Sequence, residues 1–322
     1  MVPIKLLVLS NPAAHHLRLL DHLKESADIQ VGNTPEFINA HAPSADVILV
    51  GSYEGDLLRT AFPLAKHVRW VHSLSAGVEK IVFSELAECG VPLTNGRGVF
   101  TPALAEFAIA SILYFAKDLR ALVQNQQAGK WKQFDIELIQ GQTLGIVGYG
   151  DIGRESARLA HALGMKLVAV RRNTALSDQD SILDRVFPPD ALREMLALSD
   201  FVLVTTPLTP ETRGMIGEAE FSAMKSTAVI INLGRGPVIV ESALIAALAA
   251  KTIRGAALDV FDEEPLPEGH PFYRLENVLL SPHSADHTVG WADLATRLFL
   301  DNFERFRNGQ PLRNIVDKKA GY

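Results

Sequence analysis

Cysteine is almost absent from this sequence of 322 residues, which contains only Cys89. A single cysteine cannot form an intramolecular disulfide or a thiolate zinc cluster, and such scarcity is typical of proteins from a reducing compartment. Apolar runs approaching the roughly 20 residues that span a bilayer are also absent. The apolar segment at residues 1–10 lacks the cleavage-site pattern of a signal peptide and is predicted to be a strand. We therefore expect a cytoplasmic protein with no membrane partner.

An excess of basic residues is missing as well. The chain has 31 Lys and Arg against 37 Asp and Glu, a net charge of −6. This balance gives no electrostatic footprint for a phosphate backbone, so nucleic acid is not an expected partner. The hydrophobic share of 48% is that of a globular protein and excludes a disordered chain. At about 150 residues per domain, the length predicts two domains.

Short apolar runs alternate with helical stretches through almost the whole chain, which is typical of βαβ units and parallel sheets. The runs are apolar without alternation, as expected for strands that are covered by helices on both faces. The fold class is therefore α/β with two doubly wound parallel sheets, and the longer second series fits a dinucleotide-binding (Rossmann) domain. Strands are predicted at residues 4–9, 29–32, 47–51 and 68–72, and then at 144–148, 166–170, 201–205, 228–232, 256–259 and 278–281.

Two predicted helices indicate how the domains are joined. Thr101 and Pro102 suit the start of a helix, and the helix that follows is apolar on nearly every side, which is typical of burial between two domains or two subunits. An amphipathic helix at residues 291–306 leaves too little chain after Ser284 for a separate domain. We expect residues 1–98 and 285–322 to form one domain, with a second domain, residues 99–284, inserted into it.

A glycine-rich turn follows the first strand of the second series. Residues 142–164 read QTLGIVGYGDIGRESARLAHALG, with Gly148, Gly150 and Gly153 between an apolar strand and a helix. Each glycine has a steric task in a dinucleotide site: the tight turn, the approach of the pyrophosphate, and close helix–strand packing. The amides at the helix start favour a diphosphate. We therefore expect this turn to bind the cofactor, with Tyr149, Asp151 and Ile152 contributing.

The end of the next strand indicates which cofactor is bound. An NAD site places an acid there to hold the ribose hydroxyls, whereas this chain has Arg171, Arg172 and Asn173 and no carboxylate before Asp178. Two guanidiniums suit a 2′-phosphate, which they bind by charge-assisted hydrogen bonds. The alternative is that both arginines are solvated surface residues, but the missing acid weighs against it. NADP is favoured, and NAD stays open.

Three further strand ends carry residues suited to carbonyl reduction. Arg235 follows a strand in a glycine-flanked turn, Glu264 lies a few residues beyond Asp259, and His283 follows the last strand. A cation holds a substrate carboxylate and polarises its carbonyl, while a histidine donates a proton as the hydride arrives. A neighbouring carboxylate keeps that histidine protonated near neutral pH. From the residues alone, either Glu263 or Glu264 could be this carboxylate.

Over nearly all of its length the chain resembles the D-isomer-specific 2-hydroxyacid dehydrogenase family. The motifs are GIVGYGDIGR in the glycine-rich turn, PLTPETRGMIG at residues 207–217, and MKSTAVIINLGRGPVI from Met224. The resemblance implies that Arg235 binds the carboxylate and keto oxygen of the substrate and that His283 is the acid/base. It also implies that Glu264, which directly precedes a proline, is the partner of His283, and that Asp259 contacts the nicotinamide end.

The resemblance extends to the other domain and to the assembly. Residues 73–78, SLSAGV, resemble the loop whose amides hold the substrate carboxylate, which implies substrate contacts at Ala76 and Gly77. Further cofactor contacts are expected at Thr101, Thr205, Pro207 and Thr212. Members of the family have a flavodoxin-like substrate domain and usually form homodimers through the cofactor domain.

The sequence also departs from the family pattern. Many relatives have histidine where this chain has Thr205, and the arginine pair is similar to that of NADPH-dependent glyoxylate and hydroxypyruvate reductases. Asp286 and His287 after the catalytic position are unusual; as a metal site with His283 they are disfavoured, because Pro282 argues against a preformed helical pair. We expect no metal.

The leading hypothesis is an oxidoreductase that reduces small 2-keto acids, such as glyoxylate or hydroxypyruvate, to D-2-hydroxy acids with NADPH. One alternative is a non-catalytic dinucleotide sensor, as in the corepressors that share this fold. Another is a phosphite-type dehydrogenase. A formate-type enzyme is disfavoured because that branch has glutamine in place of Glu264.

Overall fold

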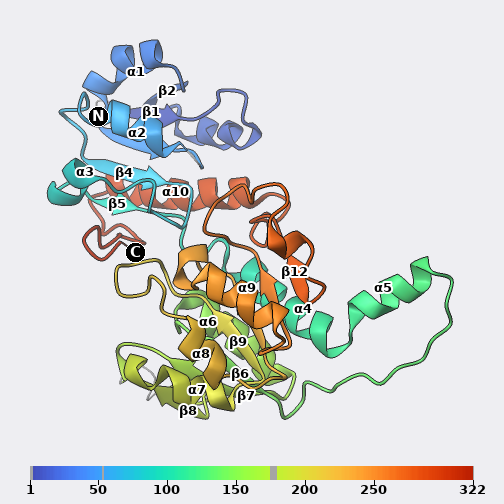
Figure 1. The fold of residues 1–322 in the computed structure, drawn as a ribbon. Helices are drawn as coiled ribbons and strands as arrows, with labels where there is room; N and C mark the ends of the chain where they lie inside the picture. The colour runs from blue at the N-terminus through green and yellow to red at the C-terminus, as the bar shows by residue number, and fades with distance from the viewer. Residues whose placement is uncertain (1–2, 53, 175–179, 322) are drawn as a thin grey trace. The chain divides into compact units, whose positions relative to one another are not determined.

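The chain folds into two compact units. A computed structural model describes residues 3–52, 54–174 and 180–321 (Figure 1). The first unit combines Met1–Phe100 with Thr288–Tyr322, and the second is the continuous segment Thr101–His287. The junctions thus fall at 100/101 and 287/288, compared with 98/99 and 284/285 in the sequence-based prediction.

The first unit is built on a five-stranded parallel sheet of order β2-β1-β3-β4-β5. This order is that of the flavodoxin-like doubly wound fold. Sequence patterning predicts four of these strands; the fifth has two residues and is too short to give a pattern. The strands are β1 (Ile4–Leu9), β2 (Ala27–Gly32), β3 (Val47–Val50), β4 (Trp70–Ser73) and β5 (Leu93–Thr94).

Helices cover both faces of this sheet because side chains alternate along each strand. Leu6 and Val8 pack with α10 (Trp291–Arg307) and the 3-10 helix η1 (His15–Leu23), whereas Leu7 and Leu9 pack toward the opposite face. The α10 helix comes from the far end of the sequence, so both ends of the chain build one core. The other helices are α1 (Pro35–His41), η2 (Ala42–Ser44), α2 (Gly55–Ala61) and α3 (Ser84–Glu88).

The second unit contains a seven-stranded parallel sheet of order β12-β11-β10-β9-β6-β7-β8. The chain winds outward from β6 in one direction and from β9 in the other, so the topological switch point lies between these two strands, where such folds bind ligands. Six of the seven strands are predicted; β8 has three residues. They are β6 (Thr143–Val147), β7 (Lys166–Val170), β8 (Arg185–Phe187), β9 (Phe201–Val204), β10 (Val229–Asn232), β11 (Gly255–Leu258) and β12 (Val278–Leu280).

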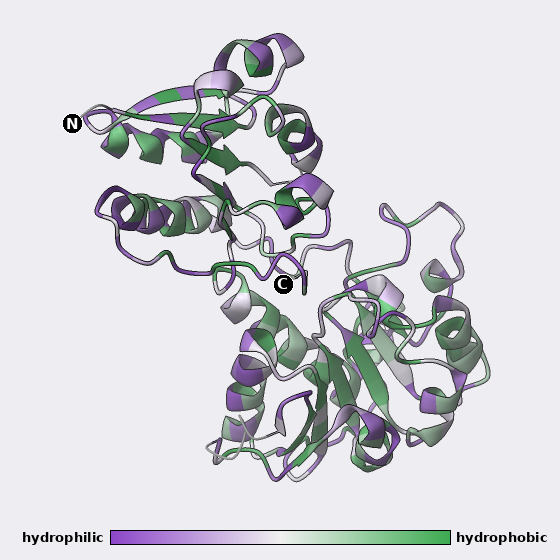
Figure 2. Cartoon of the chain, turned by 90° about the vertical axis from the view of Figure 1, so that its left-hand side faces the viewer, coloured by the Kyte–Doolittle hydropathy of each residue, from purple (hydrophilic) through white to green (hydrophobic). Residues whose placement is uncertain are grey.

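Hydrophobic residues are concentrated in the strands of both units (Figure 2). In the second unit the main core lies between the sheet and α7 (Leu192–Leu198), α8 (Glu218–Ala223) and α9 (Glu241–Ala249). The other face is covered by α6 (Asp151–Ala162), which packs on α4 (Thr101–Ala116). Within the described residues, this unit also has the 3-10 helices η4 (Pro189–Ala191), η5 (Gly236–Val238) and η6 (Pro271–Tyr273). The α/β fold class with two parallel sheets is confirmed.

An extended arm leaves the second unit after α4. It consists of α5 (Leu119–Gln127) and residues 128–140, which project away from the rest of the unit in Figure 1. Trp131 and Leu138 on this arm are 97% and 73% exposed. Among the described residues, no helix is both long enough and apolar enough to cross a bilayer.

Candidate active site

The glycine-rich turn joins β6 to α6 at the switch point of the sheet. Gly148 has a φ of +95°, and a Cβ placed there would lie 2.7 Å from the Thr206 side chain. A Cβ on Gly153 would lie 2.7 Å from the carbonyl oxygen of Gly148, whereas a Cβ on Gly150 would meet nothing within 4 Å. The three glycines therefore provide the turn, the close helix packing and an open approach, as a dinucleotide diphosphate requires. These residues fit the cofactor that the motif predicts.

The turn after β9 borders the glycine-rich turn. The Thr205 hydroxyl donates to the carbonyl oxygen of Gly148 over 2.6 Å, which ties the two neighbouring strand ends together. The Thr212 hydroxyl donates to the carbonyl oxygen of Pro207 over 2.7 Å and accepts from the Thr209 amide over 2.8 Å. These threonines therefore stabilise their own loops, while cofactor contacts at Thr205, Pro207 and Thr212, and at Thr101 in the first turn of α4, stay predictions.

The arginines after β7 lie near the glycine-rich turn. The Arg171 guanidinium carbon is 5.9 Å from the centroid of the Tyr149 ring. The Tyr149 hydroxyl donates to Asp180 Oδ2 over 2.7 Å, so the structure adds a carboxylate that the sequence analysis did not single out. A hydrogen bond from Thr209 and backbone hydrogen bonding, with a smaller contribution from the Arg172 charge, outweigh burial and lower the pKa of Glu211.

His283 and Glu264 are brought together, although 19 residues separate them. His283 Nδ1 lies 2.7 Å from Glu264 Oε2, and the Phe261 amide donates to Glu264 Oε1 over 2.9 Å. The hydrogen bond to Glu264 is the largest cause of a raised pKa at His283, and it outweighs the burial of the ring. Burial raises the pKa of Glu264, but hydrogen bonds from His283 and Phe261 outweigh it and leave that pKa lowered. The pair therefore favours imidazolium beside carboxylate.

Asp259 holds the turn that carries His283. Its Oδ1 accepts hydrogen bonds from the Ser281 hydroxyl (2.6 Å) and from the amides of Ser284 (2.9 Å) and Ala285 (3.0 Å). His283 itself has a φ of +51°, a left-handed conformation that is uncommon for a non-glycine residue. Burial raises the pKa of Asp259, and these hydrogen bonds oppose that rise. Its observed contacts are to the loop, and the contact to nicotinamide stays a prediction.

Arg235 belongs to a turn that packs directly on the loop of Glu264. A Cβ on Gly236 would lie 2.0 Å from the backbone carbonyl carbon of Phe261, so only glycine allows this contact. Asn232 fixes the turn, because its amide nitrogen donates to the Arg235 carbonyl over 3.1 Å. The Arg235 charge contributes to the lowered pKa of Glu264, after the larger effects of burial and hydrogen bonding. The structure thus gathers Arg235, Glu264 and His283 at one edge of the sheet.

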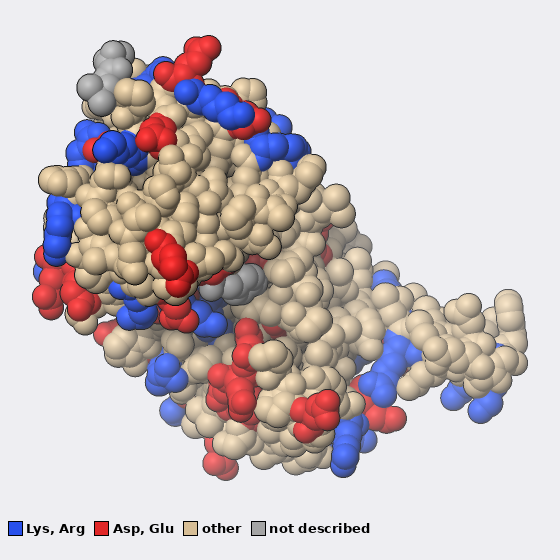
Figure 3. Space-filling model, turned by 90° about the horizontal axis from the view of Figure 1, so that it is seen from above, with Lys and Arg blue, Asp and Glu red and all other residues tan. Residues whose placement is uncertain are grey.

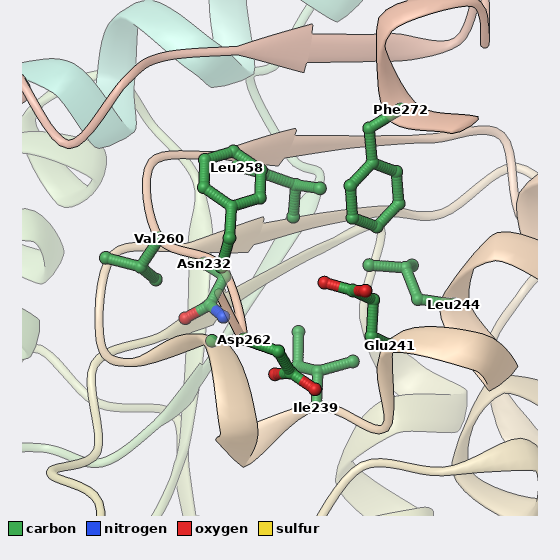
Figure 4. A pocket seen from close by; sticks show the side chains of 10 residues that line it. Asn232, Ile239, Glu241, Leu244, Leu258, Val260, Asp262 and Phe272 are labelled. Carbon is green, nitrogen blue, oxygen red and sulfur yellow. The ribbon is translucent and has the colours of Figure 1, made fainter. Parts of the chain in front are cut away.

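Behind the Arg235 turn lies a cavity of about 10 Å³, enough for about one water molecule. Its small size makes it a feature of packing. Close by, Glu241 Oε1 lies 3.1 Å from His270 Nε2, which ties α9 to the loop that follows Glu264. Figure 4 labels eight of the lining side chains: Asn232, Ile239, Glu241, Leu244, Leu258, Val260, Asp262 and Phe272.

The predicted substrate loop lies after β4 in the first unit. The Asn95 side chain donates to the Ala76 carbonyl over 2.6 Å, and the Ser75 amide donates to Ser73 Oγ over 3.2 Å. These contacts hold the backbone around Ala76 and Gly77 at the carboxyl end of the sheet. Substrate binding by this loop stays a prediction.

Asp286 and His287 are close to each other, with Asp286 Oδ1 and His287 Nε2 3.7 Å apart. Across the described parts of the chain, no group of three or more His, Cys, Asp or Glu residues could hold a metal ion.

Sequence reasoning missed Asp180, Asn232, Asn95 and Ser281. Asn232 and Ser281 stand directly at strand ends, so their position was a usable signal. Asp180 lies nine residues beyond Arg171, and no local pattern connects it to Tyr149. Its contact with Tyr149 depends on the tertiary fold, which no local sequence pattern encodes.

The glycine-rich turn at the switch point and the charged group at the neighbouring strand ends define a class, the dehydrogenases that bind a nicotinamide dinucleotide on a doubly wound sheet. Within that class, the chain belongs to the D-isomer specific 2-hydroxyacid dehydrogenase family. The family model described as "D-isomer specific 2-hydroxyacid dehydrogenase, NAD binding domain" matches residues 109–285, more than half of the chain. The family predicted from the motifs is confirmed.

Named relatives agree with this assignment. The chain is 36% identical to a glyoxylate reductase of Thermococcus gammatolerans, over 80% of this chain and 79% of the relative. It is 33% identical to glyoxylate/hydroxypyruvate reductase B of Yersinia pestis, over 99% of each chain. A solved structure of a D-isomer specific 2-hydroxyacid dehydrogenase from Xanthobacter autotrophicus, in complex with NADPH and MES, superimposes on this chain with a TM-score of 0.84. The two sequences are 28% identical, and the superposition covers 100% of each chain.

Proposed function

We propose that this protein reduces small 2-keto acids of the glyoxylate and hydroxypyruvate type to D-2-hydroxy acids, with NADPH as the reductant. The observation that carries the proposal is the His283–Glu264 pair, in which Nδ1 and Oε2 are 2.7 Å apart. The pair lies at the carboxyl ends of the strands, as does Arg235. The relatives named as glyoxylate and hydroxypyruvate reductases support the substrate class.

The charged residues divide the reaction between them. Bound NADPH supplies the hydride that reduces the keto carbon. Arg235 holds the substrate carboxylate and polarises the keto oxygen, which stabilises the negative charge that develops on it. His283 donates a proton to that oxygen from Nε2, because its Nδ1 faces Glu264. The backbone at Ala76 and Gly77 holds the substrate carboxylate.

The cofactor preference is proposed to be NADPH over NADH. Arg171 and Arg172 follow β7, at the end of the sheet where this fold binds the adenosine ribose. Their guanidiniums bind the 2′-phosphate, which NADH lacks. The solved relative in complex with NADPH supports this choice.

A substrate panel with both cofactors tests the proposal. Glyoxylate, hydroxypyruvate and pyruvate are each combined with NADPH or NADH, and cofactor oxidation is followed by absorbance in the parent protein and in Arg235→Gln. We expect rapid NADPH oxidation in the parent. In the variant, kcat should fall together with kcat/KM while NADPH affinity stays nearly unchanged, since Gln cannot supply the charge that meets the developing alkoxide. A collapse of NADPH affinity in Arg235→Gln would make Arg235 a cofactor or structural residue.

We also propose that the protein is a homodimer in a reducing compartment such as the cytoplasm, the latter on the ground of its single cysteine. The arm at residues 119–140 carries exposed apolar side chains, among them Leu122, Val123, Trp131, Ile136 and Leu138. Its surface is mostly uncharged in Figure 3. Such a surface is stabilised when a second copy covers it.

A further inference from the structure

Asp180 is a carboxylate of the cofactor domain that lies beside Tyr149 and Arg154. Its Oδ2 accepts the hydrogen bond of the Tyr149 hydroxyl over 2.7 Å and lies 3.9 Å from Arg154 Nε. The side chain is only 19% exposed. It therefore faces the glycine-rich turn and the first turns of α6, and its charge is only partly screened by solvent.

Tyr149 stands at the centre of this cluster. The guanidinium carbons of Arg154 and Arg171 each lie 5.9 Å from its ring centroid, and the residue is 3% exposed. Burial, followed by the hydrogen bond to Asp180, raises the pKa of Tyr149 well above its usual value. The hydroxyl thus stays protonated and donates to the carboxylate throughout the physiological pH range. One carboxylate and two guanidiniums consequently surround one tyrosine.

The position of the cluster connects it with cofactor choice. Tyr149 is the second residue of the glycine-rich turn, and Arg171 directly follows β7. The adenosine ribose of a dinucleotide lies between these two elements in this fold, with an acid on its hydroxyls in NAD sites and an arginine on its 2′-phosphate in NADP sites. This chain presents both kinds of group, because Asp180 is supplied by the segment before β8.

We propose that Asp180 sets the selectivity between NADPH and NADH. Its negative charge opposes the 2′-phosphate and competes with it for Arg154, whereas it can accept hydrogen bonds from the free ribose hydroxyls of NADH. The preference that the arginines create is thereby moderated. This inference rests on the proposed use of NADPH and concerns a specificity-determining residue outside the glycine motif.

Asp180→Asn removes the charge and keeps an oxygen that can accept from Tyr149. Dissociation constants for NADPH, NADH, 2′,5′-ADP and 5′-AMP are measured by calorimetry, so that the result does not depend on turnover. We expect the NADPH-to-NADH affinity ratio to rise about tenfold, and the affinity ratio of 2′,5′-ADP to 5′-AMP to rise by a similar factor. This is the size of effect expected when one of two like charges several Å apart near a protein surface is removed. The gain should shrink at high salt.

Two further variants separate selectivity from a structural role. Asp190→Asn makes the same charge change at an exposed site of the same unit and should leave the ratio unchanged. Asp180→Glu keeps the charge and should keep the ratio near that of the parent. The proposal is overturned if Asp180→Asn leaves the affinity ratio unchanged. It is also overturned if the variant weakens the binding of all four ligands equally, which is expected if Asp180 only stabilises the local structure. A parent protein that binds NADH but not NADPH would instead overturn the cofactor assignment in the proposed function.

Discussion

At the scale of single residues, the chemistry depends on the protonation of His283. Reduction needs the imidazolium as the proton donor, and Glu264 stabilises that form through a 2.7 Å contact. Asp259 contributes differently: it binds the turn around His283 by three hydrogen bonds and so holds the backbone that carries this residue. The carboxylate that stabilises the imidazolium, Glu264, and the carboxylate that holds the turn, Asp259, are thus separate residues.

The pair predicts a pH dependence. The pKa of His283 is raised in the folded protein, so reduction should be fast below the raised value and decline as the pH climbs through it. Glu264→Gln removes the charge, which should move the alkaline limb of kcat/KM for the keto acid to lower pH. The acid limb of the reverse reaction, which needs neutral imidazole, should move in the same direction. Glu263→Gln, at the exposed neighbour, serves as the control, and an unchanged limb in Glu264→Gln would exclude the pairing.

The arginines after β7 predict the cofactor preference. Each charge-assisted contact to a 2′-phosphate contributes about 1.5–3 kcal/mol, which corresponds to about 10- to 150-fold in affinity. Arg171→Ala combined with Arg172→Ala should therefore raise KM for NADPH far more than KM for NADH in steady-state assays. As a control, Arg158→Ala removes an exposed arginine of α6 that pairs with Glu155, and it should change neither KM for NADPH nor KM for NADH. Equal losses for both cofactors in the double variant would contradict the assignment.

Residue identities could be predicted where the motif is local. Gly148, Gly150 and Gly153 lie close together in the turn and the first turn of α6, and their separate steric tasks follow from the strand–turn–helix context. The choice of Glu264 over Glu263 required the family resemblance, because adjacent carboxylates look alike in the sequence; in the structure Glu264 contacts His283. Asp180 was out of reach, since its partner Tyr149 lies 31 residues away.

At the scale of secondary-structure elements, the β4–β5 pair contains a buried histidine. His72 is fully buried, its Nδ1 lies 2.7 Å from Thr94 Oγ1, and Trp70 Nε1 donates to the same oxygen over 2.8 Å. Thr94 therefore donates its proton to Nδ1, which leaves His72 neutral. Burial lowers the pKa of His72 to about 3.

This lowered pKa predicts a pH-dependent stability. The unfolded chain binds a proton at His72 near pH 6.5, whereas the folded protein does not until about pH 3. The stability that His72 supports is thus present above pH 6.5 and lost as the pH falls, by about 2 kcal/mol between pH 7 and pH 5. In urea denaturation between pH 7 and pH 5, the free energy of unfolding of His72→Phe should therefore fall by about 2 kcal/mol less than that of the parent. An equal pH dependence of stability in the two proteins would show that the pKa of His72 is not lowered in the folded protein.

The arm formed by α5 and residues 128–140 predicts the assembly. Trp131→Ser combined with Leu138→Ser should shift the protein from twice the chain mass toward the chain mass in light scattering, because the exposed apolar surface at these positions would be lost. Leu198→Ser alters an exposed leucine of α7 and should leave the mass unchanged. A parent protein that is monomeric at micromolar concentration would rule out this role for the arm.

Most strands could be predicted because they lie in apolar runs, and this holds even for the three-residue β12, whose sequence is VLL. β5 (LT) and β8 (RVF) could not, because such short strands with a polar residue form no apolar run and their pairing depends on neighbouring strands. The α4 sequence, apolar on nearly every side, indicated burial between two domains or two subunits. In the structure one face packs on α6, and Phe107 and Leu113 on other faces stay partly exposed.

At the scale of the whole molecule, the return of α10 to the first sheet makes one unit from both chain ends, and the second unit is continuous. The two doubly wound sheets could be predicted from the sequence because apolar runs alternate with helical stretches, and the family could be predicted because its motifs are continuous segments. The physiological substrate could not, because pocket shape depends on side chains from distant segments. On the face that Figure 3 shows, acidic and basic side chains are interspersed, in line with the small net charge.

The central claim is that the protein reduces a 2-keto acid to the D-hydroxy acid with NADPH. The most direct measurement is the reaction of the purified protein with hydroxypyruvate and NADPH, with cofactor oxidation followed by absorbance and the product resolved by chiral chromatography. We predict one equivalent of D-glycerate for each NADPH oxidised. Formation of L-glycerate, or no oxidation of NADPH with any 2-keto acid of this size, would contradict the account.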